Sequence, residues 1–185
     1  MKNKSEIRNN KGFSLIELLV VIAVMTLLLA VAVTSFSIVN NANVSKAAKS
    51  MESMVGTARV TSMSKGEVAG TLNIIDVSGS TYAYIGDPAL APSVPLANWT
   101  RITTGAIDTE FISSDDDPNA EVGGSELTSA VISFTPAGAV KTCTINGTDQ
   151  TGEHVTFFFK HGRRGARAYF YRATGKHSMS IYNVY

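Results

Sequence analysis

The sequence predicts an α+β fold, in which a long N-terminal helix packs on an antiparallel β-sheet head. Apolar residues run from Phe13 to Val33, and apolar positions then recur at helical spacing as far as Lys65. After Gly66 the helical period disappears, and short β-rich segments alternate with Gly, Pro, Asn and Asp clusters. About 150 residues follow the apolar run, which suits one compact domain.

The apolar run is long enough to cross a membrane. Only Ser14, Glu17 and Thr26 interrupt it. As a helix it would extend about 31 Å, and the hydrocarbon core of a bilayer is about 30 Å thick. Basic residues precede it and favour the cytoplasmic side: Lys2, Lys4, Arg8 and Lys11. We therefore expect a transmembrane helix over residues 13–35, with the rest of the chain outside the cytoplasm.

Glu17 lies where a membrane segment should carry no charge, at a cost of about 2.5–3.5 kcal/mol on an insertion scale. A secretory signal cut near Ala30-Val31-Ala32 would have too long an apolar core. A plain signal anchor would leave the carboxylate without a role. Cleavage between Gly12 and Phe13 would keep the whole helix on the mature chain, so we prefer this third interpretation.

The segment KGFSLIELLVVIA, residues 11–23, resembles the N-terminus of type IV pilins and type II secretion pseudopilins. The resemblance implies that a prepilin peptidase removes residues 1–12 after Gly12 and methylates the new amine of Phe13. It also implies that Glu17 pairs with the Phe13 amine of a neighbouring subunit in a filament core. The protein would be held in the bacterial inner membrane by one span, with its head in the periplasm, before an assembly platform adds it to a periplasmic or cell-surface filament.

Elementary electrostatics agrees with this pairing. A carboxylate and an ammonium both lack solvation in lipid, so pairing removes part of the penalty of each. Removal of residues 1–12 lowers the count of Lys and Arg from 16 to 12 and that of Asp and Glu from 15 to 14. The net charge moves from +1 to −2, which argues against general affinity for nucleic acid.

The next segment, residues 36–66, has the pattern of an amphipathic helix that packs on the head. Lys46, Lys49, Glu52 and Arg59 fall mostly on its polar face. Asn40–Asn43 is poor in helix formers, so we expect a loosened turn there, and Lys65-Gly66 is a natural stop. The apolar positions are Val44, Ala47, Ala48, Met51, Met54, Val55, Ala58 and Met63.

Residues 67–185 form the predicted β-rich head. Residues 131–138, VISFTPAG, resemble a strand-turn motif in heads of the GspH/FimT branch of minor pseudopilins and minor pilins. The single Cys143 lies in a predicted strand and is expected to be buried. We expect strands at Leu72–Val77, Thr81–Ile85, Trp99–Thr103, Ala130–Thr135, Val140–Ile145, Val155–Phe159, Ala168–Tyr171 and Ser180–Val184.

Two charged segments of the head have alternative interpretations. Asp115, Asp116 and Asp117 offer oxygen ligands for calcium, but their spacing fits no EF-hand and favours a solvated loop. Arg163, Arg164 and Arg167 lie beside the aromatic residues Tyr169–Tyr171, a pattern that suits phosphate contact and base stacking on DNA. Contact with a filament partner, or a simple hairpin tip at Gly162–Gly165, competes with DNA binding.

The sequence contains no catalytic motif and indicates no cofactor. We therefore predict a structural subunit rather than an enzyme. The preferred function is a minor subunit of a type II secretion-like pseudopilus, which works with other pilin-like subunits. The alternative is a minor type IV pilin that binds DNA through its C-terminal basic segment in natural transformation.

Overall fold

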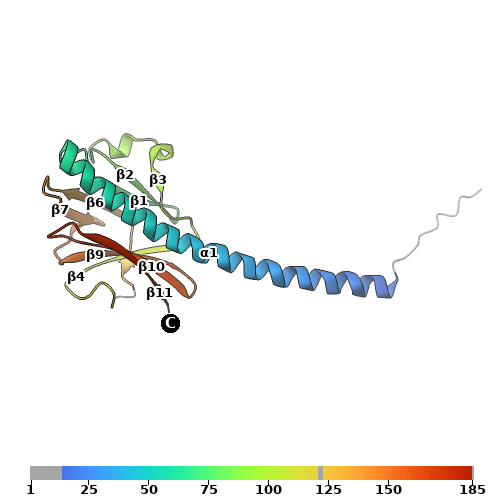
Figure 1. Cartoon of the computed structure of the whole chain (residues 1–185). Helices are drawn as coiled ribbons and strands as arrows, with labels where there is room; N and C mark the ends of the chain where they lie inside the picture. Colours follow the sequence, from blue (N-terminus) through green and yellow to red (C-terminus); the bar gives the residue numbers. More distant parts are fainter. Residues whose placement is uncertain (1–13, 121–122, 185) are drawn as a thin grey trace, which may run out of the picture. The chain divides into compact units, whose positions relative to one another are not determined.

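The computed structural model describes residues 14–120 and 123–184, leaving aside the side chains of residues 31–38 and 40. The chain divides into two compact units, Met1–Ile38 and Val39–Tyr185. The first unit contributes helix alone within the described residues. The second unit contains the remaining helical turns and all the strands (Figure 1).

One helix, α1 (Leu15–Lys65), accounts for both predicted helical segments. It continues through Asn40–Asn43, so the expected loosened turn is not observed. Beyond these asparagines the helix buries Val44 and Ala47 in the core, and packing of this kind outweighs weak helix propensity. The helix ends at Lys65, and the next residue, Gly66, adopts φ +95° and donates its N–H to the Ser62 carbonyl at 3.0 Å. The predicted stop is therefore confirmed.

The head contains two antiparallel sheets. The first sheet has the strand order β3-β2-β1-β6-β7-β8, and the second has the order β11-β10-β9-β4-β5. The first sheet is built from β1 (Leu72–Val77), β2 (Ser80–Ile85), β3 (Thr100–Arg101), β6 (Ser129–Phe134), β7 (Val140–Ile145) and β8 (Thr148–Asp149). The second is built from β4 (Asp108–Ser114), β5 (Ser125–Glu126), β9 (His154–His161), β10 (Arg164–Tyr171) and β11 (His177–Asn183).

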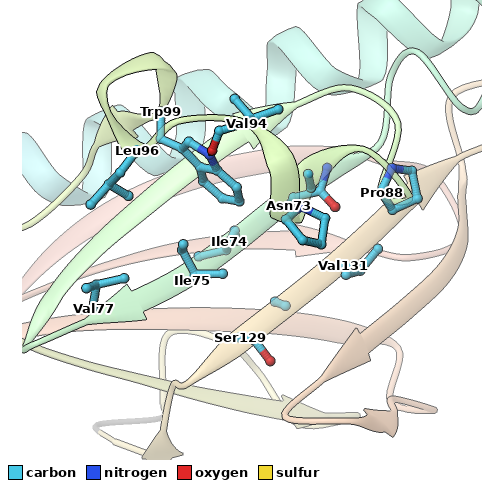
Figure 2. Close-up of a pocket in the computed structure, with 13 residues that line it drawn as sticks. Asn73, Ile74, Ile75, Val77, Pro88, Val94, Leu96, Trp99, Ser129 and Val131 are labelled. Atoms are coloured by element: carbon cyan, nitrogen blue, oxygen red, sulfur yellow. The ribbon is translucent and has the colours of Figure 1, made fainter.

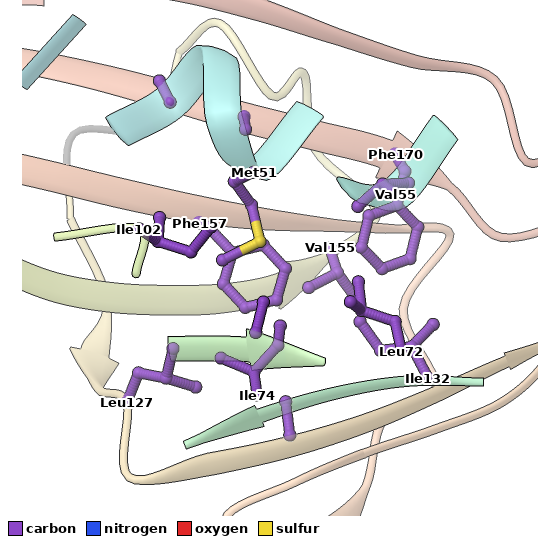
Figure 3. Packing of buried hydrophobic residues seen from close by; sticks show 14 of the residues in the cluster. Met51, Val55, Leu72, Ile74, Ile102, Leu127, Ile132, Val155, Phe157 and Phe170 are labelled. Atoms are coloured by element: carbon purple, nitrogen blue, oxygen red, sulfur yellow. The ribbon is translucent and has the colours of Figure 1, made fainter. Parts of the chain in front are cut away.

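The core lies where α1 meets the inner faces of both sheets. Figure 3 shows Met51 and Val55 of α1 pointing toward Phe157 and Phe170 of the second sheet, with Ile132 of the first sheet nearby. The buried apolar residues of the helix are Val44, Ala47, Ala48, Met51, Val55 and Ala58. The α+β prediction is thus confirmed, as is the apolar stripe over most of its length.

The last predicted core position of the helix is wrong. Met63 is half exposed, and its neighbour Ser62 is buried instead. The Ser62 hydroxyl donates a hydrogen bond of 2.5 Å to the Phe134 carbonyl at the end of β6. A small hydroxyl fits here because the helix passes close to strand backbone that needs a donor. Helical periodicity alone does not reveal such a close approach.

The eight predicted strands are all present, with ends that shift by a few residues. β1 and β7 have the predicted bounds, whereas β9 and β10 are longer than predicted and form one hairpin. The sequence analysis missed β4, a full member of the second sheet, and the two-residue strands β5 and β8. In β4 only Asp108 and Thr109 differ clearly in burial, and Phe111 contacts the core beside the apolar Ile112, so the strand has no clear alternation in its sequence.

A proline-rich segment, residues 86–99, lies against the outer face of the first sheet. It contains two short 3₁₀ helices, η1 (Ala91–Ser93) and η2 (Leu96–Asn98). Trp99 ends the segment and is buried, with its ring centroid 5.5 Å from that of Tyr84 on β2. The Trp99 indole N–H donates to the Val94 carbonyl at 3.3 Å, which holds the segment closed on itself.

Candidate assembly segment and head surfaces

The N-terminal part of α1 exposes apolar side chains on every side. All described side chains from Ser14 to Ala30 are exposed, including Leu15 at 83% and Ile16 at 71%. Successive helical residues point about 100° apart, so such a run leaves no polar face. A helix that is apolar all round is stable when it is buried in a protein core or in lipid. This segment therefore needs an apolar environment beyond its own side chains.

Glu17 is the one charged residue among the described residues of this segment. It lies in the first turn of α1, three residues after Ser14, which directly precedes the helix. A serine followed by a glutamate at this spacing is the capping-box pattern, in which the carboxylate approaches free backbone N–H groups. The Thr26 hydroxyl donates to the Ala23 carbonyl at 2.8 Å and is satisfied within the helix. Within the described part of this segment, Glu17 is thus the one charge on an apolar surface.

The predicted processing residues, Gly12 and Phe13, lie outside the described residues. The proposed transmembrane segment at 13–35 begins among them, and it stays a prediction. Within residues 14–120 and 123–184, no helix meets the combined requirements of length and hydropathy for crossing a membrane.

In the head, Arg163 and Arg164 occupy the tip of the β9–β10 hairpin. Gly162 and Arg163 form the two-residue turn, and Gly162 adopts φ +57°, a conformation that glycine permits. Both arginines are exposed. Gly165, which the sequence placed in the turn, belongs instead to β10 and is buried against the Tyr182 ring. The hairpin-tip interpretation describes this site correctly.

Of the three arginines predicted as possible DNA contacts, Arg167 is the one for which the prediction is wrong. It lies in β10 and is only 4% exposed. One of its guanidinium nitrogens donates to the Pro118 carbonyl at 2.7 Å, and its guanidinium carbon lies 4.4 Å from the centroid of the Tyr182 ring. These contacts hold the loop at Pro118 against the outer face of the second sheet. Arg167 therefore has a structural role that its place in the sequence does not reveal.

The fold also separates the basic residues that are close together in the sequence. Arg163 and Arg164 lie at one end of β10, whereas Arg172 and Lys176 follow its other end. Eight strand residues span about 23 Å at 3.3 Å per step. Lys160, near the tip, forms an ion pair with Glu110 at 2.6 Å, which neutralises its charge. The exposed basic surface at the hairpin tip therefore consists mainly of two arginines.

Two carboxylates of the aspartate loop accept backbone hydrogen bonds, one from within the loop and one from a distant segment. A carboxylate oxygen of Asp115 accepts the backbone N–H of Glu153 at 2.7 Å, and one of Asp117 accepts the backbone N–H of Asn119 at 2.9 Å. Asp116 is exposed. Across the described residues, no three or more His, Cys, Asp or Glu side chains gather in a way that could hold a metal ion. These hydrogen bonds account for the positions of Asp115 and Asp117. Calcium binding at Asp115, Asp116 and Asp117 stays a prediction without structural support.

The buried Cys143 and the partly buried Tyr182 have raised pKa values. Burial raises the pKa of the Cys143 thiol to about 12, and this outweighs the opposing charge of Arg172. Burial likewise raises the pKa of Tyr182 to about 12, with Arg167 acting in the opposite direction. The expectation of a buried cysteine is confirmed. Such a thiol is a poor nucleophile at neutral pH.

Comparison with known protein families gives one match. Residues 7–33 match the family described as Prokaryotic N-terminal methylation motif. Comparison with curated proteins and with solved structures gave no significant match.

The matched region covers the predicted cleavage site and the start of the apolar helix. The chain therefore carries the prepilin-type motif of type IV pilins and pseudopilins, on an α+β head of pilin-like architecture. Proteins with this motif are structural subunits rather than enzymes. The motif implies processing by a prepilin peptidase, anchoring in the inner membrane and assembly with other pilin-like subunits.

Proposed function

We propose that this chain is a minor subunit of a type II secretion-like pseudopilus, assembled through its N-terminal helix. The observation that carries the proposal is the exposure of apolar side chains all round α1 before residue 31, with one carboxylate among them. Lateral packing of such helices in a filament would bury this surface, at about 25 cal/mol per Å² of apolar area. The head would remain outside the bundle.

Glu17 would set the axial position of each subunit. After cleavage the nearest positive charge in the mature chain would be the amine of Phe13, four residues before it. The carboxylate of Glu17 could meet the amine of its own chain, one helical turn away, or the amine of a neighbouring subunit. Only the contact between subunits would make assembly depend on the acid, because an internal contact would already be complete in the monomer.

Two features support a minor subunit of the GspH/FimT branch. The strand-turn segment at residues 131–138 corresponds to β6 and the turn before β7, and Gly138 in this turn accepts a hydrogen bond of 2.9 Å from Arg59 of α1. The chain also has a single cysteine, so it lacks the paired cysteines that often close the C-terminal loop of major pilins. Subunit counts in sheared filaments test this point, since a major subunit would dominate them.

The assembly proposal is tested by exchanging Glu17→Leu and Glu17→Gln, with Glu52→Gln as the matched control on the head part of the same helix. We expect both Glu17 variants to lose incorporation into filaments by tenfold or more, because the buried amine would lack a counter-charge. Glu52→Gln should assemble normally. Mass spectrometry should find the mature protein beginning with methylated Phe13. Normal assembly of Glu17→Leu would contradict the proposal.

DNA binding is the second candidate, favoured by the two exposed arginines at the β9–β10 tip. The double exchange Arg163→Gln and Arg164→Gln should reduce the slope of log affinity against log salt by about 2. Arg101→Gln, at an exposed position on β3, is the control and should leave the slope unchanged. Absence of duplex binding at low salt would eliminate this candidate.

A further inference from the structure

An apolar cavity of about 450 Å³ lies between the first sheet and the proline-rich segment. Its floor is the outer face of β1 and β6, represented by Ile75 and Val131 in Figure 2. Its wall comes from the proline-rich segment, whose lining residues are Pro88, Ala91, Pro92, Val94, Leu96 and Trp99. Cavities of about 300–1,000 Å³ with apolar walls and few polar groups are typical of ligand sites.

Asn73 supplies an unusual polar group to this cavity. It is 3% exposed and lies on β1 among the lining residues. Its amide nitrogen donates to three backbone carbonyls, those of Gly86 at 3.0 Å, Thr71 at 3.4 Å and Tyr84 at 3.5 Å. The NH₂ group has two hydrogens, which these carbonyls share, and only this end of the amide can donate to carbonyl oxygens, so the orientation of the amide is determined.

The amide oxygen of Asn73 is therefore turned away from those carbonyls. Among the described residues, no hydrogen bond reaches this oxygen, and it is not one of the fully buried side-chain atoms that lack a partner, so it keeps contact with solvent. A ligand that filled the cavity would displace this solvent and leave the acceptor unpaired unless the ligand carried a hydrogen-bond donor. A ligand with a single donor would therefore be favoured.

The rest of the lining restricts the ligand further. Asn73 and Ser129 are the only polar residues among the lining residues, and none of these carries a charge. Burial of a charged ligand would thus be unfavourable. Trp99 and the prolines offer flat apolar surfaces, which suit an aromatic ring. Val77 and Leu96, at the rim, are each 40% exposed, so a ligand that filled only the cavity would leave apolar surface uncovered.

We propose that the cavity binds a tyrosine or tryptophan side chain of a partner protein, whose O–H or N–H donates to the Asn73 amide oxygen. These two side chains combine a large apolar body with a single donor, and they are the common anchors of protein interfaces. The surface around the anchor would cover Val77 and Leu96. This site lies on the head and does not depend on the assembly function of Glu17.

Trp99 makes the proposal directly testable, because it is the only tryptophan of the chain and it lines the cavity. The full chain, kept in solution by an amphipathic polymer, is titrated with 4-methylphenol, N-acetyltyrosine amide and toluene, with excitation at 295 nm. The variants Val131→Phe and Ala91→Leu fill the cavity from its floor and from its wall. Thr142→Phe, on the outer face of the same sheet but outside the cavity, is the matched control.

We expect saturable changes of Trp99 emission with 4-methylphenol and with N-acetyltyrosine amide, and about tenfold weaker binding of toluene, which lacks the donor. At least one filling variant that retains the far-ultraviolet circular dichroism of the native chain should lose binding by tenfold or more. Thr142→Phe should bind normally.

Three results would overturn the proposal. Equal binding of toluene and 4-methylphenol would remove the role of Asn73. Binding of 4-methylphenol without binding of N-acetyltyrosine amide would show that the cavity takes a free small molecule rather than a protein side chain. No saturable response to any probe would show that solvent fills the cavity.

Discussion

The two parts of α1 have the same secondary structure but differ in which of their side chains are buried. From Val44 to Ala58 the helix buries one face in the head, and its charged residues lie on the other. From Leu15 to Ala30 apolar side chains are exposed on every side. In the first part the apolar side chains are buried within one molecule, whereas in the second part they are exposed. The difference teaches that a helix can be amphipathic where it packs on its own head and apolar on every side where it does not.

The largest expected effect comes from one pair of matched residues, Met51 and Met25. Met51→Ala should lower the free energy of unfolding of the head by about 2–5 kcal/mol, because a fully buried side chain leaves a cavity. Met25→Ala should change it by less than about 0.5 kcal/mol, because Met25 is 57% exposed. Urea unfolding of the full chain, followed by Trp99 fluorescence, measures both. Equal losses would show that the two parts of α1 are not distinct.

A second pair separates the structural arginine from those at the hairpin tip. Arg167→Met should destabilise the head by about 2 kcal/mol, since it removes a charged hydrogen bond to Pro118 and the contact with the Tyr182 ring. Arg163→Met should be close to neutral. The same urea titration applies. If Arg163→Met lowered the free energy of unfolding more than Arg167→Met, the assignment of Arg167 as the residue that holds the Pro118 loop would be wrong.

A smaller effect is expected where α1 leaves the core. Ser62→Ala removes the donor to the Phe134 carbonyl and should cost about 1 kcal/mol. Ser64→Ala is the control, because its exposed hydroxyl bonds only to carbonyls of its own helix. A neutral Ser62→Ala would mean that the close approach of α1 to β6 contributes little to stability.

The smallest effect concerns alkaline pH. The Cys143 thiol has a pKa raised from an ordinary value of 9.0 to about 12, so the unfolded chain releases this proton first. Stability from this group is full below pH 9 and declines as pH rises toward 12. Between pH 7 and 9.5 the loss should stay below about 1 kcal/mol. In Cys143→Ala the free energy of unfolding should fall less between pH 7 and 9.5. An identical fall in both proteins would contradict the role of the Cys143 thiol.

Local patterns in the sequence were sufficient for several features of the head and helix. The apolar stripe of α1, the stop at Gly66 and eight strands follow from periodicity and turn residues, which act over a few neighbouring positions. The N-terminal motif is also local, and its match over residues 7–33 needs no tertiary information. Strand β4 was missed because Asp108–Ser114 contains only two apolar residues, Phe111 and Ile112, which are adjacent and give no alternation.

The sequence by itself determined the helix, most strands and the prepilin-type start, since each depends on residues adjacent along the chain. Only the tertiary structure decided which arginine is buried, where Ser62 meets Phe134, and that Asn73 and Trp99 border one cavity. These relations join residues 26 to 72 positions apart, and the pairing of strands and the packing of two sheets bring them together. Because burial and hydrogen-bond satisfaction are properties of such assembled neighbourhoods, no local pattern reports them.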